Sequence, residues 1–190
     1  FFLQAEDGIR DSSTSRGLGD VYKRQTLSPF ALVREVREFF DGPLALSGSI
    51  SEGSSVLSAL ALGADFAYVG TKFIATEEAN ASPGYKQMII DSTADDIMYS
   101  ATFTGVNGNY LRPSVEAAGL NPDEHMSGSK DDMNFSTSAI AKKDNSSKAW
   151  KDIWGSGQGI GSIKNAPSVE DAVNQMVSEY DDAKSRLESF

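Results

Sequence analysis

Two pairs of residues in the first half of this 190-residue chain have the types and spacing to bind a phosphate group. Gly48-Ser49 and Gly70-Thr71 each follow a short apolar run that we interpret as a buried strand. A glycine and a hydroxyl residue at a strand end offer backbone N–H groups to an anion, and a following helix favours negative charge there. Two such strand ends in succession can hold one phosphate. The alternative is that the glycines only permit tight turns.

The surrounding pattern predicts how these strand ends are positioned. A helix is expected over residues 29–40, because Ser28-Pro29 is a typical helix start and apolar residues recur at helical spacing up to residue 41. Strands are expected at residues 44–47 and 66–69, with a helix over residues 52–62 that ends at Gly63. Helix, strand, helix and strand with short loops indicate a parallel α/β sheet. A last helix is expected over residues 169–187, and a polar loop over residues 121–145.

A third candidate element is the glycine-rich segment over residues 155–161, which contains Gln158. Glycines permit close approach of backbone to a planar ligand, and a glutamine side chain offers both a donor and an acceptor to a ring edge. Taken alone, such a segment is more often a flexible turn. Trp150 and Trp154 stand four positions apart, and we interpret them as packing residues rather than ligand-stacking ones.

Longer stretches around these motifs resemble the nitronate monooxygenase family, also called 2-nitropropane dioxygenases. The resemblance is strongest over residues 46–78, where Val69-Gly70-Thr71-Lys72-Phe73 is similar to the family's Met-Gly-Thr-Arg-Phe. Residues 154–161 are similar to the family's Ala-Gly-Gln-Gly-Val-Gly segment. One departure is Gly48-Ser49-Ile50, where the family typically has Gly-Gly-Ile; serine is tolerable there only if its φ angle is accessible.

The resemblance implies a partial (β/α)8 TIM barrel, made of the last βα units, plus C-terminal helices. It implies an FMN cofactor, bound at its phosphate by Gly48, Ser49, Gly70 and Thr71 and at its ring by Gln158. The implied activity is oxidation of an alkyl nitronate or nitroalkane with O2, giving a carbonyl compound and nitrite. Two alternatives stay open. One is an NAD(P)H-dependent flavin reductase of the same barrel group, acting on a quinone or an enoyl thioester. The other is a gene fragment with no activity of its own.

No catalytic residue is predicted within the chain. In the family, a Gly-Gly-His-x-Gly motif just before the segment equivalent to residues 26–30 supplies the base, and here that place is occupied by Tyr22-Lys23-Arg24-Gln25. The single histidine, His125, lies in a polar stretch where a solvent-exposed loop residue is the expected role.

Residues 1–25 show neither helical nor strand periodicity, and we predict no element there. Their sequence resembles a translated adapter that recurs at the ends of environmental sequences. We therefore predict two parts: a non-native or disordered head over residues 1–25, and a flavin-binding barrel part over residues 26–190.

Composition limits the possible partners. A net charge of −10 argues against nucleic acid and anionic membranes, which require a basic patch. The absence of cysteine excludes disulfides and thiolate metal sites, and with no apolar run long enough to span a bilayer it favours a cytoplasmic location. The carboxylates at Asp91, Asp95 and Asp96 and over residues 123–132 have no histidines paired with them, so we predict no metal site.

Overall fold

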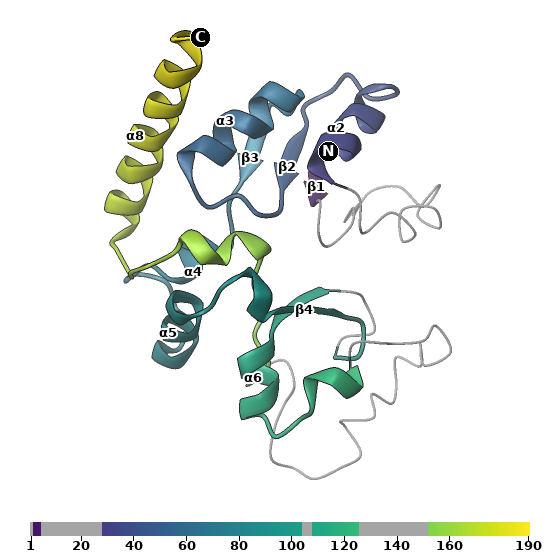
Figure 1. Ribbon diagram of the computed structural model, residues 1–190, viewed down its shortest axis with the longest axis vertical. Coiled ribbons are helices and arrows are strands. Elements are labelled where there is room, and N and C mark those ends of the chain that lie inside the picture. The colour runs from purple at the N-terminus through teal and green to yellow at the C-terminus, as the bar shows by residue number, and fades with distance from the viewer. Residues whose placement is uncertain (1, 5–27, 104–107, 126–151) are drawn as a thin grey trace.

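The computed structural model describes residues 2–4, 28–103, 108–125 and 152–190. Its upper part in Figure 1 is a parallel sheet in the order β1-β2-β3, built from β1 (Phe2–Gln4), β2 (Ala45–Ser47) and β3 (Phe66–Tyr68). Helix α3 (Gly53–Leu62) connects β2 to β3, and Ala45 pairs with Phe66 and Ser47 with Tyr68. The predicted parallel pairing of these two strands is therefore confirmed.

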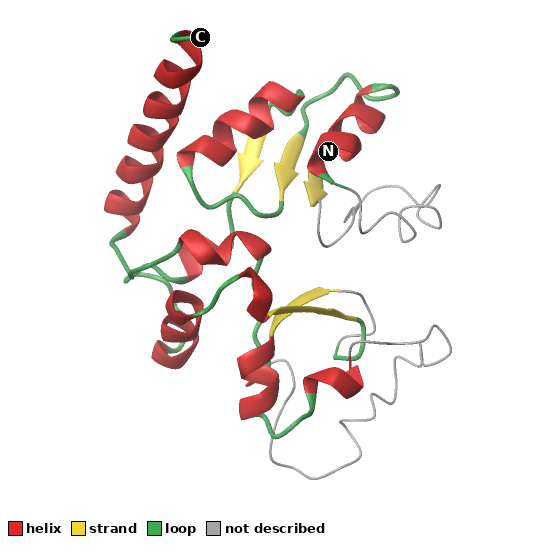
Figure 2. Ribbon diagram, in the orientation of Figure 1, coloured by secondary structure: helices red, strands yellow, loops and turns green. Residues whose placement is uncertain are grey.

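Helices α2 (Pro29–Arg37) and α3 cover one face of this sheet (Figure 2). Val33 of α2, Leu44 and Leu46 are almost completely buried in one cluster with Ala59 of α3. Burying each of the larger side chains contributes about 1.5–3 kcal/mol. The other face of β3 is open, since Phe66 and Tyr68 are 60% and 54% exposed.

The two helices begin and end where local chemistry requires. The Ser28 hydroxyl accepts a hydrogen bond from the Phe30 N–H, and Pro29 occupies the first turn, where its missing N–H costs nothing. Helix α2 ends at Arg37, three residues before the predicted end. Helix α3 ends at Gly63, whose φ of 112° is the left-handed conformation that glycine adopts without strain.

The expectation of no element in residues 1–25 is wrong at Phe2–Gln4, which forms β1 and pairs in parallel with β2. The unpaired N–H and C=O groups along an edge of β2 provide a template that a short extended segment can satisfy without any amphipathic pattern. Residues 5–27 lie outside the described residues, so the interpretation of the stretch as a non-native head stays a prediction.

Below the sheet in Figure 1 lies a second group of elements. It contains α4 (Thr71–Ile74), α5 (Pro83–Asp91), the 3-10 turn η2 (Ala94–Asp96), β4 (Ile97–Ser100), β5 (Gly108–Leu111), α6 (Arg112–Ala117) and η3 (Pro122–His125). Strands β4 and β5 form an antiparallel hairpin. The hydropathy pattern does not predict this hairpin, because polar Ser100 and Asn109 occupy buried positions and hide the alternation that is typical of strands.

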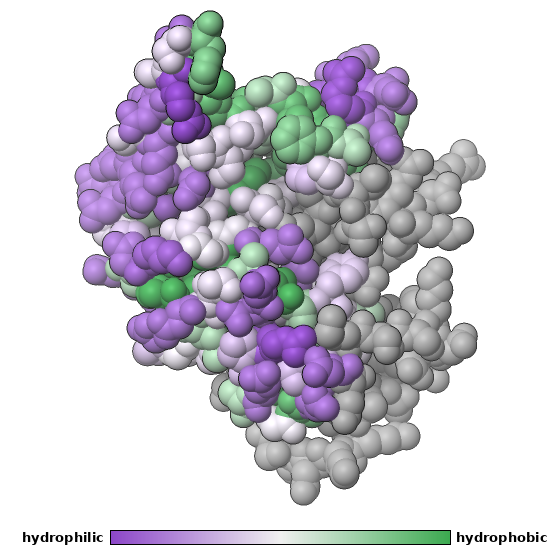
Figure 3. Space-filling model, viewed as in Figure 1, coloured by the Kyte–Doolittle hydropathy of each residue, from purple (hydrophilic) through white to green (hydrophobic). Residues whose placement is uncertain are grey.

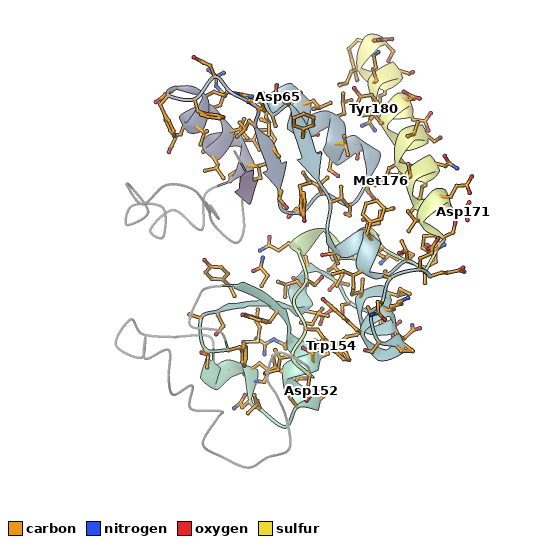
Figure 4. All side chains as sticks on the ribbon, turned by 180° about the vertical axis from the view of Figure 1, so that it is seen from behind. Asp65, Asp152, Trp154, Asp171, Met176 and Tyr180 are labelled. Atoms are coloured by element: carbon orange, nitrogen blue, oxygen red, sulfur yellow. The ribbon has the colours of Figure 1, made fainter. Side chains whose placement is uncertain are left out.

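Helix α8 (Val169–Glu188) packs against α3, close to the predicted bounds. Met176 and Tyr180 lie on the side of α8 that approaches the sheet part (Figure 4). The approach is so close that a Cβ atom at Gly53 would lie 2.0 Å from the Met176 carbonyl oxygen and 2.3 Å from the Tyr180 nitrogen. In Figure 3 the outer side of α8 is mainly hydrophilic, while hydrophobic side chains gather over α3.

The predictions for Trp150, the polar loop, membrane-spanning helices and metal sites concern other parts of the chain. Trp150 and most of the predicted polar loop lie outside the described residues. Among the described residues no helix is long and apolar enough to cross a membrane, and no group of three or more acidic or histidine side chains could hold a metal ion. The Asp96 carboxylate instead accepts a hydrogen bond from the Thr93 N–H at 2.7 Å, which caps η2.

Candidate functional site

A cavity lies where β2 and β3 end. Gly48 and Ser49 follow β2, Gly70 and Thr71 follow β3, and all four line this cavity. The remaining lining residues are Ser47, Ile50, Ser51, Tyr68, Gly157 and Gly159. The two strand ends that the sequence pattern predicts to share one pocket therefore lie together in the structure.

The third wall comes from the segment around η6 (Gln158–Ser162), which folds back onto the strand ends from far along the chain. The Gly157 N–H donates to the Thr71 hydroxyl oxygen at 2.9 Å, and the Ser51 hydroxyl donates to the Gly159 carbonyl at 2.7 Å. Gly159 has to be a glycine here, because an added Cβ would lie 2.8 Å from the Ser49 carbonyl oxygen. The glycine-rich segment thus reaches the site through its backbone.

Gln158, which the resemblance places at the flavin ring, does not line the cavity. It stands between Gly157 and Gly159, is exposed, and is not among the residues that line the cavity. Its side chain is therefore at the rim of the site rather than in its wall. A role at a ring that extends out of the cavity stays a prediction.

Ser49 adopts a left-handed backbone conformation, with φ of 54°, directly after Gly48 with φ of 108°. Serine stands here where the family typically has the second glycine of Gly-Gly-Ile, and its backbone adopts a positive φ angle at this position. The turn after β2 has two successive positive φ angles, and serine occupies the second one, although residues other than glycine, asparagine and aspartate rarely do so.

The N-terminus of α3 does not provide the anion site that the strand-to-helix pattern suggested. The Gly53 N–H donates to a Glu179 carboxylate oxygen at 2.8 Å, and the Glu52 side chain accepts from the backbone of Ser55 in a capping box. Two carboxylates already satisfy this helix end. An anion in the cavity would therefore be bound by the turn at residues 48–50 and not by the helix terminus.

Tyr85 of α5 anchors the segment that leads into the third wall. Its ring stacks on Trp154, with centroids 5.0 Å apart, and its hydroxyl donates to the Gly155 carbonyl. Burial raises the pKa of Tyr85 to about 12, so this hydroxyl stays protonated and a donor at neutral pH. The packing role predicted for Trp154 is confirmed. Tyr85 was missed because a single tyrosine early in a helix carries no distinctive sequence signal.

The cavity has a volume of about 100 Å³. Pockets that enclose whole small-molecule ligands are larger, about 300–1,000 Å³. This space suits a phosphate group rather than an entire cofactor. None of its ten lining residues carries a charge, so hydrogen bonds would have to hold an anion there. Lys72, the next residue after Thr71, is buried with 4% exposure.

The lining residues also include no imidazole or carboxylate that could act as a base. His125 ends η3, and its side chain lies outside what the structure describes, as do residues 22–25 where the family's motif would end. The cavity lining offers backbone groups and hydroxyl groups. Proton abstraction would need a group that it does not contain.

The fold is of the α/β class, and the cavity lies at the carboxyl ends of parallel strands, where open α/β sheets generally bind their ligands. Solved structures with the same fold include a nitroalkane oxidase from Streptomyces ansochromogenes, at 22% identity and a TM-score of 0.67 over 98% of this chain. FabK from Thermotoga maritima is similar with 21% identity and a TM-score of 0.65 over 99% of this chain. This chain covers 52% of the first structure and 56% of the second.

Sequence comparison then narrows this class to a family. The model of the nitronate monooxygenase family matches residues 15–179, so this chain belongs to that family of oxidoreductases. A nitronate monooxygenase from Paraburkholderia phytofirmans is 31% identical over 96 residues, which are 50% of this chain and 26% of that protein. The chain therefore spans only part of the length of the relatives that it matches.

Proposed function

We propose that this chain is the C-terminal part of an FMN-dependent (β/α)8-barrel nitronate monooxygenase, and that the cavity holds the flavin phosphate. The observation that carries the proposal is the shared cavity at the ends of β2 and β3. In barrels of this type the phosphate site is formed by the loops after the last two strands. Family membership supports the oxidoreductase class, and the size of the cavity fits the phosphate end of the cofactor.

The roles of individual residues follow from their positions. Gly48, Ser49 and Gly70 present backbone to the phosphate, and Gly70 leaves space, because an added Cβ would meet no atom within 4 Å. The Thr71 hydroxyl accepts from Gly157 and keeps its own proton to donate to a phosphate oxygen. Gln158, at the rim, would hydrogen-bond the flavin ring.

The flavin supplies the redox chemistry, and the protein supplies binding, orientation and exclusion of water. The substrate is a nitronate or nitroalkane, with O2 as the second substrate. Because the lining residues offer no base, we expect the base to come from a segment that precedes Thr26 in a longer form of the protein. The resemblance places the family's Gly-Gly-His-x-Gly motif there.

Binding of FMN and riboflavin by the 190-residue chain tests the phosphate site, since the two ligands differ only in the phosphate. Equilibrium dialysis should show tighter binding of FMN. The Gly70→Leu variant should lose this preference without losing stability, because its side chain fills open space in the cavity. Gly161→Leu is the matched control, since a Cβ at Gly161 also meets no atom within 4 Å and Gly161 does not line the cavity. Unchanged FMN binding by Gly70→Leu would remove the phosphate site.

The activity is tested on a gene extended upstream of Thr26. Nitronate-dependent O2 uptake without NADH is the expected result. Consumption of NADH with reduction of bound FMN would instead favour the flavin reductase of the same barrel group. Absence of both activities in a protein that retains FMN would favour an inactive fragment.

A further inference from the structure

Tyr68 differs from the other residues of the cavity wall in both type and exposure. It lines the cavity, and yet it is 54% exposed. The other described lining residues are glycines, serines, one threonine and one isoleucine, so Tyr68 supplies the aromatic ring of this wall. Ligand sites in proteins are commonly lined by aromatic side chains together with a few polar groups. A ring that belongs to the wall and also reaches solvent stands where a ligand would leave the cavity.

The pairing of the strands determines the side of the sheet on which the Tyr68 side chain lies. Ser47 and Tyr68 are partners in the parallel ladder, so their side chains share one face of the sheet. Leu46 and its partner Ala67 point to the opposite face, where they pack in the core cluster with α2 and α3. Tyr68 therefore lies on the face that these helices do not cover (Figure 2). Phe66, two residues earlier, shares this face and is 60% exposed.

The backbone that carries Tyr68 is held in place on both sides. The Ser47 hydroxyl donates to the Tyr68 carbonyl at 3.2 Å, in addition to the ladder between β2 and β3. Three residues later, the Thr71 hydroxyl accepts from the Gly157 N–H at 2.9 Å. Tyr68 thus projects from a strand, whereas Gln158 stands in a turn between two glycines. A side chain on a strand keeps its position more precisely than one on a loop.

The size of the cavity determines which part of a ligand meets Tyr68. The volume of about 100 Å³ suits a phosphate group, so the flat ring system of FMN, at the other end of its ribityl chain, has to lie outside. We propose that this ring system stacks on the Tyr68 side chain, and that Tyr68 thereby gives the site its preference for flat aromatic ligands. This inference rests on the proposed function. Stacked aromatic rings attract each other beyond the effect of the area that they bury.

Substitutions at two exposed aromatic positions of β3 test the stacking in the 190-residue chain. Equilibrium dialysis should show that Tyr68→Leu binds FMN and riboflavin about threefold to tenfold more weakly than wild type, with the ratio of the two affinities unchanged. Tyr68→Phe keeps the ring and should bind both flavins within about twofold of wild type. Phe66→Leu is the matched control, because it removes a ring from the same face at a position that does not line the cavity. Its affinities should stay within about twofold of wild type.

The fluorescence of bound FMN gives a second measurement that a purely structural role of Tyr68 would not change. A tyrosine ring in contact with a flavin quenches its fluorescence by donating an electron to the excited flavin, and phenylalanine is too poor a donor to do so. Bound FMN should therefore be brighter in Tyr68→Phe than in wild type, at nearly equal affinity. Since Tyr68 is exposed, all three variants should melt within about 2 °C of wild type without ligand.

The results distinguish the possible failures. If Tyr68→Leu binds both flavins as tightly as wild type, or if bound FMN is equally bright in wild type and Tyr68→Phe, the stacking is overturned while the phosphate site stands. Equal losses in Tyr68→Leu and Phe66→Leu also overturn it, because the whole uncovered face and not the cavity mouth would then control binding. If wild type binds FMN no more tightly than riboflavin, the proposed phosphate site fails. A wild-type chain that binds neither flavin contradicts both proposals.

Discussion

At the scale of single residues, the end of the sheet remote from the cavity is held by polar contacts around Asp65 (Figure 4). Its carboxylate accepts from the Leu44 N–H at 2.8 Å and from the Arg37 guanidinium at 2.7 Å. Arg37 also donates to the carbonyls of Gly63 and Gly42, both at 2.8 Å. This cluster joins the end of α2, the cap of α3 and the start of β2.

The cluster should make stability depend on acidic pH. The backbone hydrogen bond from Leu44, and then the Arg37 contacts, lower the pKa of Asp65 below its ordinary value of 3.8. A carboxyl with a lowered pKa in the folded state stabilises the protein above its unfolded pKa, and this contribution disappears as the pH falls through the folded pKa. Wild type should melt at a higher temperature than Asp65→Asn at pH 7, and the difference should shrink below about pH 3.8.

Asp181→Asn serves as the control for this prediction, because it removes an exposed carboxylate on α8 and changes the net charge equally. Its melting temperature relative to wild type should vary little over the same pH range. A difference between wild type and Asp65→Asn that stays constant from pH 7 to pH 3 would contradict the assigned role of the carboxylate.

At the scale of elements, the packing of α8 on α3 depends on Gly53. Any side chain there would collide with backbone atoms of α8, which cannot rotate away as a side chain could. Gly53→Ala should therefore lower the free energy of unfolding by about 1–3 kcal/mol or more, although alanine is the better helix former. Gly161→Ala, which has open space, should change it by less than about 0.5 kcal/mol. Urea denaturation measures both, and equal effects would contradict the close helix contact.

At the scale of the whole molecule, the segment over residues 154–159 connects the hairpin part to the sheet. The backbone N–H of Trp154 donates to the Ser114 hydroxyl oxygen. The backbone N–H of Leu111 donates to the Trp154 carbonyl at 2.8 Å. Farther along, Gly157 and Gly159 bond to Thr71 and Ser51 beside the cavity. The segment that lines one side of the cavity is therefore bonded both to the sheet and to the hairpin part of the molecule.

Ligand binding should consequently stabilise the chain as one unit. FMN at 100 times its dissociation constant adds about 2.7 kcal/mol to the free energy of unfolding. For a chain of this size that corresponds to a rise of about 5–10 °C in melting temperature. Scanning calorimetry should show one transition that shifts as a whole. Two transitions, with only one responding to FMN, would show that the two parts unfold independently.

The sequence by itself determined the local elements around the site and the family. Ser28-Pro29, Gly63 and the glycine-hydroxyl pairs at 48–49 and 70–71 act through their own backbone preferences, so helix limits and strand ends could be predicted to within a few residues. The βαβ pattern also predicts that both strand ends lie at the same edge of the sheet, because parallel strands place their carboxyl ends together.

Only the tertiary structure decided which groups fill the site. Glu179 caps α3 from 126 positions away, which removes that helix end as an anion site. Ser49 has a left-handed conformation next to Gly159, which has no room for a Cβ atom there, and Gln158 does not line the cavity although both of its neighbours do. The hairpin of β4 and β5 buries polar side chains that no hydropathy pattern marks. Each of these features depends on contacts between distant segments, and those contacts form only when the chain has folded.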